Sequence, residues 1–284
     1  FSLLAIPFFV LAGGIMAEGG MANRLINLAK VFVGFIKGGL ALVNIMASTL
    51  FGCISGSSVA DTSAIGSVMI PQMVKAGFPR VFATNVTICG SVQALMIPPS
   101  HNAVIYSLAA GGTVSVAHLF LAGILPGLLF GLCLIGLVLW TSHKREYPKG
   151  EPVALKDIPK IVTDALWGLV TIFIIMGGIL SGVFTPTEGA IAACVWALIL
   201  GFFWYRTLNL KMFVKVCLDT VETTATVLFI VAAASIFGWM LTATGVIAAI
   251  SSWVLAFTRD PWVFLLLANL LMLFVGCFLE PTAA

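Results

Sequence analysis

Long apolar runs separated by short polar segments make up most of this sequence. About 20 apolar residues in a helix cross the roughly 30 Å of hydrocarbon in a bilayer, so the longest runs predict membrane spans. These runs lie at residues 119–140, 165–181, 189–205, 223–241 and 262–279. Shorter apolar runs at 3–17 and 246–257, and an amphipathic run at 21–36 typical of an interfacial helix, bring the expected total to about seven or eight crossings or partial crossings.

A polar segment, Ser55-Gly56-Ser57-Ser58, separates the apolar runs 39–54 and 59–74. The helix after it would rise only about 25 Å at 1.5 Å per residue, less than the hydrocarbon thickness. A polar turn cannot face lipid, because each unsatisfied backbone group there costs several kcal/mol. The pattern therefore predicts a re-entrant helical hairpin whose tip is buried in protein near the middle of the membrane.

Two further interruptions are expected at membrane depth. Pro98-Pro99-Ser100-His101-Asn102 breaks the run that begins at 82, and Glu280 to Thr282 follows the last apolar run. Each break frees carbonyls at one helix end, which suit a hard cation such as Na⁺. Each also frees N–H groups at the next helix start, which suit a carboxylate.

Structural roles compete with these functional ones. Ser57 and Ser58 are also typical of helix caps, and the two prolines are also compatible with a simple kink. Asp61 is either part of a site, as an ionisable group at that depth suggests, or a cap of the second hairpin helix. We interpret His101 as a polar cavity residue, and Glu188, after Thr185-Pro186-Thr187, as the first turn of a helix.

Charge predicts the orientation of the spans, because basic loops stay in the cytoplasm. The loops 143–160 and 206–219 are rich in Lys and Arg and are expected there. Counting spans backwards places Lys37, Lys75 and Arg80 on the same side. The hairpin would then leave the cytoplasmic side and return to it.

A weak internal repeat adds to this picture. Gly14-x-Met16 matches Gly238-x-Met240, and Gly52-Cys53 matches Gly276-Cys277, both at a shift of 224 residues. The charge pattern orients the two copies oppositely, and inverted repeats with broken helices are the pattern of secondary transporters. We expect a first repeat at 1–140, linking spans at 141–222, and a second repeat at 223–284. The sequence begins and ends inside this pattern, as a piece of a longer protein would.

Composition agrees with a membrane protein, since 61% of the residues are hydrophobic and only 9% are charged. The net charge of +3 gives no reason to expect nucleic acid as a partner. The six cysteines lie in apolar runs and are interpreted as packing residues. No motif of hydrolysis or nucleotide binding occurs, so we predict no enzyme and no organic cofactor, and an all-α polytopic fold.

Taken together, several motifs resemble the large membrane subunit of the tripartite ATP-independent periplasmic (TRAP) transporters. They are IPFFVLAG from Ile6, SGSS from Ser55, AIGS from Ala64, IPPS from Ile97, FLAGILPG from Phe120 and GVFTPTE from Gly182. The resemblance implies an elevator-type transporter in the bacterial inner membrane. It would take an organic acid anion from a periplasmic substrate-binding protein and import it with Na⁺, beside a small four-helix membrane subunit, separate or fused.

The resemblance also implies site residues by position. One Na⁺ site would use Ser55, Gly56, Ser57, Ser58, Ile97, Pro98 and Ser100, and a second would use Gly276, Glu280 and Thr282. The substrate would contact Ser57, Ser58, Asp61, Ser100, His101 and Asn102. His101 and Asn102 replace the apolar residues that follow Pro-Pro-Ser in many relatives, which favours a polyhydroxylated acid such as sialic acid over a C4-dicarboxylate. The alternatives are a passive channel and a purely structural membrane subunit.

Overall fold

The structure is a computed structural model that describes residues 2–111, 113–150, 152–257 and 260–278. Its regular elements are helices, and no strand occurs among the described residues. They are η1 (Ser2–Leu4), α1 (Ala5–Glu18), α2 (Met21–Val33), α3 (Gly39–Ser55), α4 (Ser58–Lys75), α5 (Arg80–Met96), α6 (His101–Ala109), α7 (Val116–Lys144), α8 (Ile158–Leu180), α9 (Pro186–Ile199), η2 (Leu200–Trp204), α10 (Leu210–Ala243), α11 (Val246–Phe257) and α12 (Pro261–Gly276).

The predicted all-α membrane fold is confirmed. Among the described residues, four helical segments are long and apolar enough to cross a bilayer: α7, α8, α9 with η2, and α10. Two helix pairs are bent too sharply to be straight spans, α1 with α2 by 70° and α5 with α6 by 52°. The second of these bends is the break expected at Pro98-Pro99.

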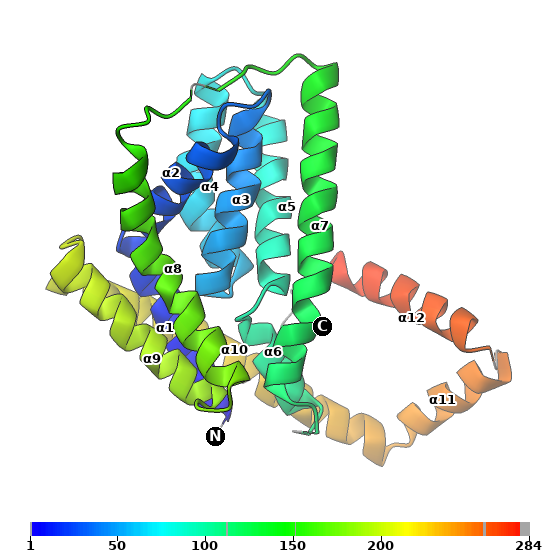
Figure 1. Ribbon diagram of the computed structural model, residues 1–284. Helices are drawn as coiled ribbons and strands as arrows, with labels where there is room; N and C mark the ends of the chain where they lie inside the picture. The colour runs from blue at the N-terminus through cyan, green and yellow to red at the C-terminus, as the bar shows by residue number, and fades with distance from the viewer. Residues whose placement is uncertain (1, 112, 151, 258–259, 279–284) are drawn as a thin grey trace. The chain divides into compact units, whose positions relative to one another are not determined.

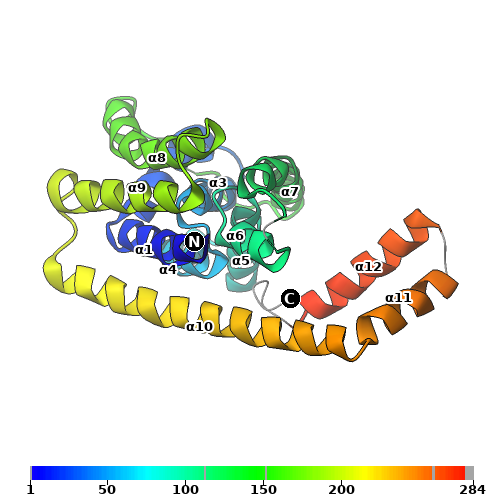
Figure 2. The ribbon, with the colours of Figure 1, turned by 90° about the horizontal axis from the view of Figure 1, so that it is seen from below.

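The chain divides into two compact units, Phe1–Val221 and Glu222–Ala284, and the division falls inside α10. In the first unit α3, α4 and α5 pack together, with α7 along α5 on one side and α1, α2, α8 and α9 on the other (Figures 1 and 2). One continuous hydrophobic core joins them and includes Phe51, Ile54, Ile65 and Met69, each fully buried.

The helical hairpin predicted around the SGSS segment is present. Helices α3 and α4 are joined only by Gly56 and Ser57, and they pack against each other and against α5. The hairpin helices are 17 and 18 residues long, against 29 residues in α7. The hairpin therefore extends along only part of the longest span beside it (Figure 1).

A clasp of residues holds the base of the hairpin, opposite its tip. Lys37, just before α3, forms an antiparallel bridge with Lys149 in the loop after α7. In the same loop, the ring of Tyr147 packs on Phe78 and Phe82 at centroid distances of 4.8 and 4.9 Å. Both ends of the hairpin thus lie on the side of the 143–160 loop, as the charge pattern predicts. That this side is the cytoplasm stays a prediction.

The prediction of a loop at 206–219 was wrong in part, because α10 begins at Leu210. The charged residues in this segment indicated a loop, but Lys211, Lys215 and Asp219 lie on α10 and only Arg206 precedes it. Lys215 Nζ lies 3.0 Å from Glu18 Oε1 of α1. This ion pair gives the charged side chain of Lys215 a partner while it lies on helix α10. Likewise α8 begins at Ile158, inside the predicted 143–160 loop.

The second unit contains the rest of α10 with α11 and α12. The order of a helix, a short helix of 12 residues and a helix of 16 residues matches α1, α2 and α3, where the lengths of the latter two are 13 and 17 residues. The repeat, its inverted orientation and the proposed domain boundaries stay predictions.

The bridge between Lys37 and Lys149 generates a test of the clasp. Paired bridge residues in antiparallel strands have Cα atoms about 4.5–5.5 Å apart, within the range of a disulfide. A Lys37→Cys/Lys149→Cys double variant should therefore crosslink on mild oxidation, detected as a linked peptide by mass spectrometry. Lys37→Cys/Lys211→Cys is the control, expected to stay unlinked. Equal yields from both pairs would contradict the clasp.

Candidate functional site

The hairpin tip is built by a glycine and a serine. Gly56 ends α3 in the left-handed region, at φ +61°, where a residue without Cβ is favoured. Ser57 is extended and caps α4, with its Oγ accepting from the Ala60 N–H at 3.3 Å. The capping role that competed with a site role is thus confirmed for Ser57, although its hydroxyl hydrogen stays available.

The second break follows from its prolines. A residue before proline avoids the helical region, and Ile97 is extended, with ψ +128°, directly after α5 ends at Met96. Ser100 is extended as well, and α6 begins at His101. Unlike Ser57, Ser100 makes no side-chain cap to its helix, so its hydroxyl is free to bind something else.

The hairpin tip and this break lie in direct backbone contact. A Cβ added at Gly56 would lie 2.7 Å from the Pro99 carbonyl oxygen, and 3.4 Å from both the His101 nitrogen and the Ser100 Cα. Only a glycine allows this approach. The contact brings together two helix C-termini, those of α3 and α5, and two helix N-termini, those of α4 and α6.

The contact lies well inside the span of α7. Gly123 and Gly127 of α7 pack on Met96 and Ile97, with added Cβ atoms 2.5 Å from the Met96 oxygen and 2.7 Å from Ile97 Cγ1. Gly127 is about 17 residues, or about 26 Å, from Lys144 at the charged end of α7, and about 17 Å from Val116 at the other. The break is therefore far from both ends of the span.

A third glycine packs the tip from the opposite side. An added Cβ at Gly13 of α1 would lie 3.0 Å from the Ser55 Cα. The IPFFVLAG and FLAGILPG motifs thus supply the small residues that let α1 and α7 approach the two breaks. Sequence reasoning missed this role, although a glycine inside an apolar helix that approaches another backbone is its usual signal.

The candidate residues of the first repeat are brought together by this geometry. Ser55, Gly56, Ile97, Pro98, Ser100 and His101 are buried, and Ser57, Ser58 and Asn102 are partly exposed. Gly276 is the last residue of α12 in the second unit. The remaining candidates, Glu280 and Thr282, lie outside the described residues.

Two polar atoms at the start of α6 have no hydrogen-bond partner. His101 Nδ1 and Asn102 Oδ1 are both shielded from solvent, and neither atom makes a hydrogen bond. Buried polar atoms normally have a partner from protein or water, so these two are suited to a ligand at the break. The helix N-termini beside them offer N–H groups to an anion, whereas Asn102 Oδ1 can only accept a hydrogen bond, for example from a ligand hydroxyl.

Asp61 differs from the other candidates because its carboxyl contacts Ser91 of α5 and none of the other candidate residues. It is fully buried, and Oδ2 lies 2.6 Å from Ser91 Oγ of α5. Ser48 of α3 lies near it, and the buried side chains of Asn44 and Thr87 bond each other between α3 and α5. Sequence reasoning did not assign these residues, although polar residues spaced four apart in the apolar runs of α3 and α5 were a visible signal.

Glu188 is confirmed as part of a helix start. Its Oε2 accepts from the Thr185 N–H at 2.7 Å, and the Glu188 N–H donates to Thr185 Oγ1 at 3.3 Å, a complete capping box for α9.

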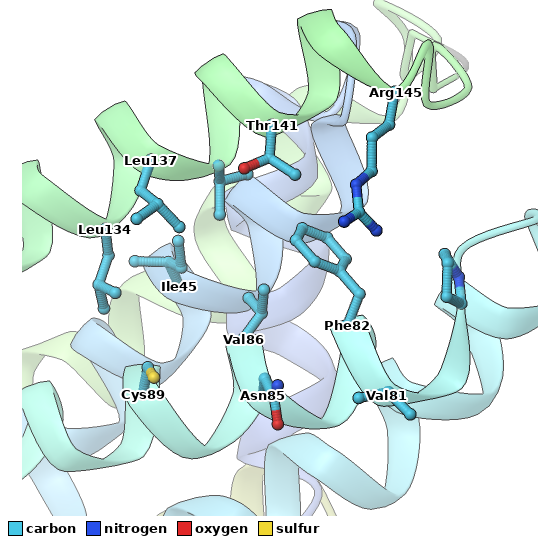
Figure 3. Close-up of a pocket in the computed structure, with 12 residues that line it drawn as sticks. Ile45, Val81, Phe82, Asn85, Val86, Cys89, Leu134, Leu137, Thr141 and Arg145 are labelled. Atoms are coloured by element: carbon cyan, nitrogen blue, oxygen red, sulfur yellow. The ribbon is translucent and has the colours of Figure 1, made fainter.

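A separate pocket of about 370 Å³ opens between α3, α5 and α7, near the clasp (Figure 3). Its walls are mostly apolar, for example Ile45, Val86 and Leu134, and the Arg145 side chain points toward Phe82 at one end. None of the tip or break residues lines it. This pocket is therefore not part of the candidate site.

Comparisons with known proteins agree with these features. The model of the family described as the tripartite ATP-independent periplasmic transporter, DctM component, matches residues 1–284. The chain is 45% identical to the uncharacterized protein YgiK of Salmonella typhimurium and 41% identical to the C4-dicarboxylate TRAP transporter large permease protein DctM of Pseudomonas aeruginosa. It is 40% identical to the sialic acid TRAP transporter large permease protein SiaM of Vibrio cholerae.

Each of these relatives is longer than the sequence described here. All of the chain is covered in each comparison, but it spans 65% of YgiK and 66% of the DctM and SiaM proteins.

The contact between the tip and the break predicts the effect of adding one methyl group. Gly56→Ala should lower the free energy of unfolding by about 1–2 kcal/mol, because alanine disfavours the left-handed backbone conformation. The clash of its Cβ with Pro99 should cost about 1–3 kcal/mol more. Gly182→Ala is the matched control, because Gly182 has φ +76° and no atom within 4 Å of an added Cβ. Gly56→Ala should lower the melting temperature of the purified protein clearly more than Gly182→Ala. Equal shifts would contradict the close contact.

Proposed function

The chain belongs to the family of the DctM component of tripartite ATP-independent periplasmic transporters, and from this premise we propose that it imports an organic acid anion together with Na⁺. The observation that carries the proposal is the contact of Gly56 with Pro99, which gathers two helix C-termini and two helix N-termini inside the span of α7. Carbonyls for a cation and N–H groups for an anion are thus available in one place.

We propose that Na⁺ binds at the carbonyl ends of α3 and α5. The last carbonyls of a helix have no partner within it, and oxygen ligands suit a hard cation. Backbone and hydroxyl oxygens of Ser55, Gly56, Ser57, Ser58, Ile97, Pro98 and Ser100 would form this site. Gly276, Glu280 and Thr282 would contribute to a second Na⁺ site in the other repeat.

The substrate anion would bind at the N-termini of α4 and α6. Their N–H groups and positive dipole ends favour a carboxylate. Ser57, Ser58 and Ser100 offer hydroxyl groups, and His101 Nδ1 and Asn102 Oδ1 have no partner in the protein. Asp61, also expected at the substrate, has its carboxyl directed to Ser91 instead.

The assembly would be that of the whole family. We propose a location in the bacterial inner membrane with the 143–160 loop in the cytoplasm, a periplasmic substrate-binding protein that delivers the anion, and a small membrane subunit beside the scaffold. The hairpin and the broken helix α5–α6 would move together as part of an elevator.

The names of the relatives point to two substrate classes, a C4-dicarboxylate and sialic acid. We favour the polyhydroxylated acid, because His101 and Asn102 add hydrogen-bonding groups beside the N-terminus of α6. Such groups recognise hydroxyls, which a C4-dicarboxylate lacks or has fewer of.

Na⁺ coupling is tested by uptake into proteoliposomes that contain the complete transporter and its binding protein. Uptake should require an inward Na⁺ gradient. Ser58→Ala should raise the half-saturating Na⁺ concentration by about tenfold, equal to about 1.4 kcal/mol for one lost contact. Ser57→Ala should act similarly, with an additional loss of stability from its cap. Ser67→Ala is the control, since Ser67 is exposed and bonds only Ala64 of its own helix.

Two outcomes would contradict this proposal. Flux without Na⁺ and without a binding protein would indicate a passive channel. A Na⁺ dependence that is the same in the wild type and in Ser58→Ala would remove the tip from the ion site.

Substrate class is tested with His101→Ile. Losing one hydrogen bond to a hydroxyl should reduce uptake of sialic acid about 3- to 10-fold and leave uptake of a C4-dicarboxylate nearly unchanged. The matched control is His118→Ile on the exposed part of α7, which should alter neither. Equal ratios of the two uptake rates in His101→Ile and wild type would exclude this role of His101.

A further inference from the structure

A row of buried polar side chains lies between α3, α4 and α5, on the inner side of the hairpin. Asn44, Ser48, Asp61 and Thr87 are fully buried, and Ser91 is 1% exposed. The side chains of α3 and α5 are four residues apart in each helix, so they share one face. Asp61 is the one carboxylic acid in the row, and it comes from the first turn of α4.

The hydrogen bonds in this row leave Ser91 with two possible acceptors and one hydrogen. Ser91 Oγ lies 2.9 Å from the Thr87 carbonyl oxygen, one turn earlier in α5. It also lies 2.6 Å from Asp61 Oδ2. A serine hydroxyl has one hydrogen and two lone pairs. If that hydrogen goes to the Thr87 carbonyl, the contact with Asp61 needs a hydrogen from the carboxyl group.

We infer that Asp61 binds a proton in this conformation and donates it from Oδ2 to Ser91 Oγ. Ser91 then donates its own hydrogen to the Thr87 carbonyl, and each of the two short contacts has one hydrogen. The other carboxyl oxygen, Oδ1, has no partner at hydrogen-bond distance, and neither has the nearby hydroxyl of Ser48. A protonated carboxyl group, which itself donates one hydrogen bond, fits this setting. An ionised carboxylate would instead need several hydrogen-bond donors around it.

Asp61 has no ion-pair partner among the described residues, and the ion pair between Lys215 and Glu18 does not involve it. On the elements packed against α4, the charged groups are engaged elsewhere. Lys30 of α2 donates to Gln72, and Arg24 of α2 donates to the carbonyl groups of Gly19 and Gly20. Glu18 of α1 is in the ion pair.

The remaining titratable groups on these helices are distant or uncharged. Lys75 of α4 is about 21 Å along the helix from Asp61, and Arg80 is about 17 Å along α5 from Ser91. The thiols of Cys53 in α3 and Cys89 in α5 are not among the side chains that interact with the Asp61 carboxyl. The N-terminal dipole of α4 favours an anion, but a fully buried carboxylate without a cation is strongly disfavoured.

The bound proton would hold the hairpin against α5 through a hydrogen bond that exists only while Asp61 is protonated. With the proton, the neutral acid joins α4 to α5 through Ser91. Without it, the single hydrogen of Ser91 is shared between two acceptors, and a negative charge is left in the core. Loss of the proton to water should therefore accompany separation of α4 from α5. This inference does not depend on the proposed transport of Na⁺ or of an organic anion.

Infrared difference spectroscopy of the purified full-length protein tests the inference without any transport measurement. Exposed carboxyl groups are already ionised at neutral pH, so a protonated-acid carbonyl band that persists there and disappears toward alkaline pH should report Asp61. The band should be lost in Asp61→Asn, which keeps a neutral donor for Ser91. It should shift in Ser91→Ala, which removes the acceptor. Asp157→Asn, at an exposed position, is the control and should keep the band.

Two results would overturn the inference. One is the absence of a protonated-acid band in the wild type at neutral pH. The other is a band that survives in Asp61→Asn. If Asp61→Asn fails to fold, Ser91→Ala decides, because an unshifted band in that variant would exclude the Asp61–Ser91 hydrogen bond.

Discussion

The architecture depends on one constraint, namely that backbone groups released by a broken helix must find partners inside the protein. In lipid each such group costs several kcal/mol if it is left unpaired. Here two breaks face each other, so that the backbone of Gly56 lies against Pro99 and the start of α6. Glycines of α1 and α7 close the contact from both sides. The same groups that are costly in lipid become available to ions and anions.

Polar side chains act as a second means of holding these helices together. Asn44 Nδ2 donates to Thr87 Oγ1 at 2.7 Å, and Thr49 Oγ1 lies 3.0 Å from Gln93 Oε1, both between α3 and α5. Such contacts contribute about 0.6–2 kcal/mol each in membranes. They also fix the register of α3 on α5, because a slip of one residue would turn each pair apart. The position of the tip against the break follows from that register.

Much of the fold could be predicted from the sequence because lipid restricts the options so strongly. The SGSS hairpin and the Pro-Pro break were predicted from helix length and from the cost of polar backbone, and both are present. The start of α10 was not predicted, because the charged residues at 211–219 are typical of a loop. The ion pair of Lys215 with Glu18 of α1 is visible only in the structure. The roles of Gly13, Gly123 and Gly127 were missed because they depend on which helices meet. For the site, residues at 55–58 and 97–102 were predicted as one group, whereas the orientation of Asp61 depends on its neighbours in α3 and α5.

The clasp at the base of the hairpin bears on how this element can deform. Lys37 is bridged to Lys149, and Tyr147 is wedged against two phenylalanines, so the two helices are pinned together at the end remote from the breaks. Two helices held together at one end can separate only at the other. Any separation of α3 from α4 should therefore be greatest at Gly56 and should decrease to nothing toward Lys37.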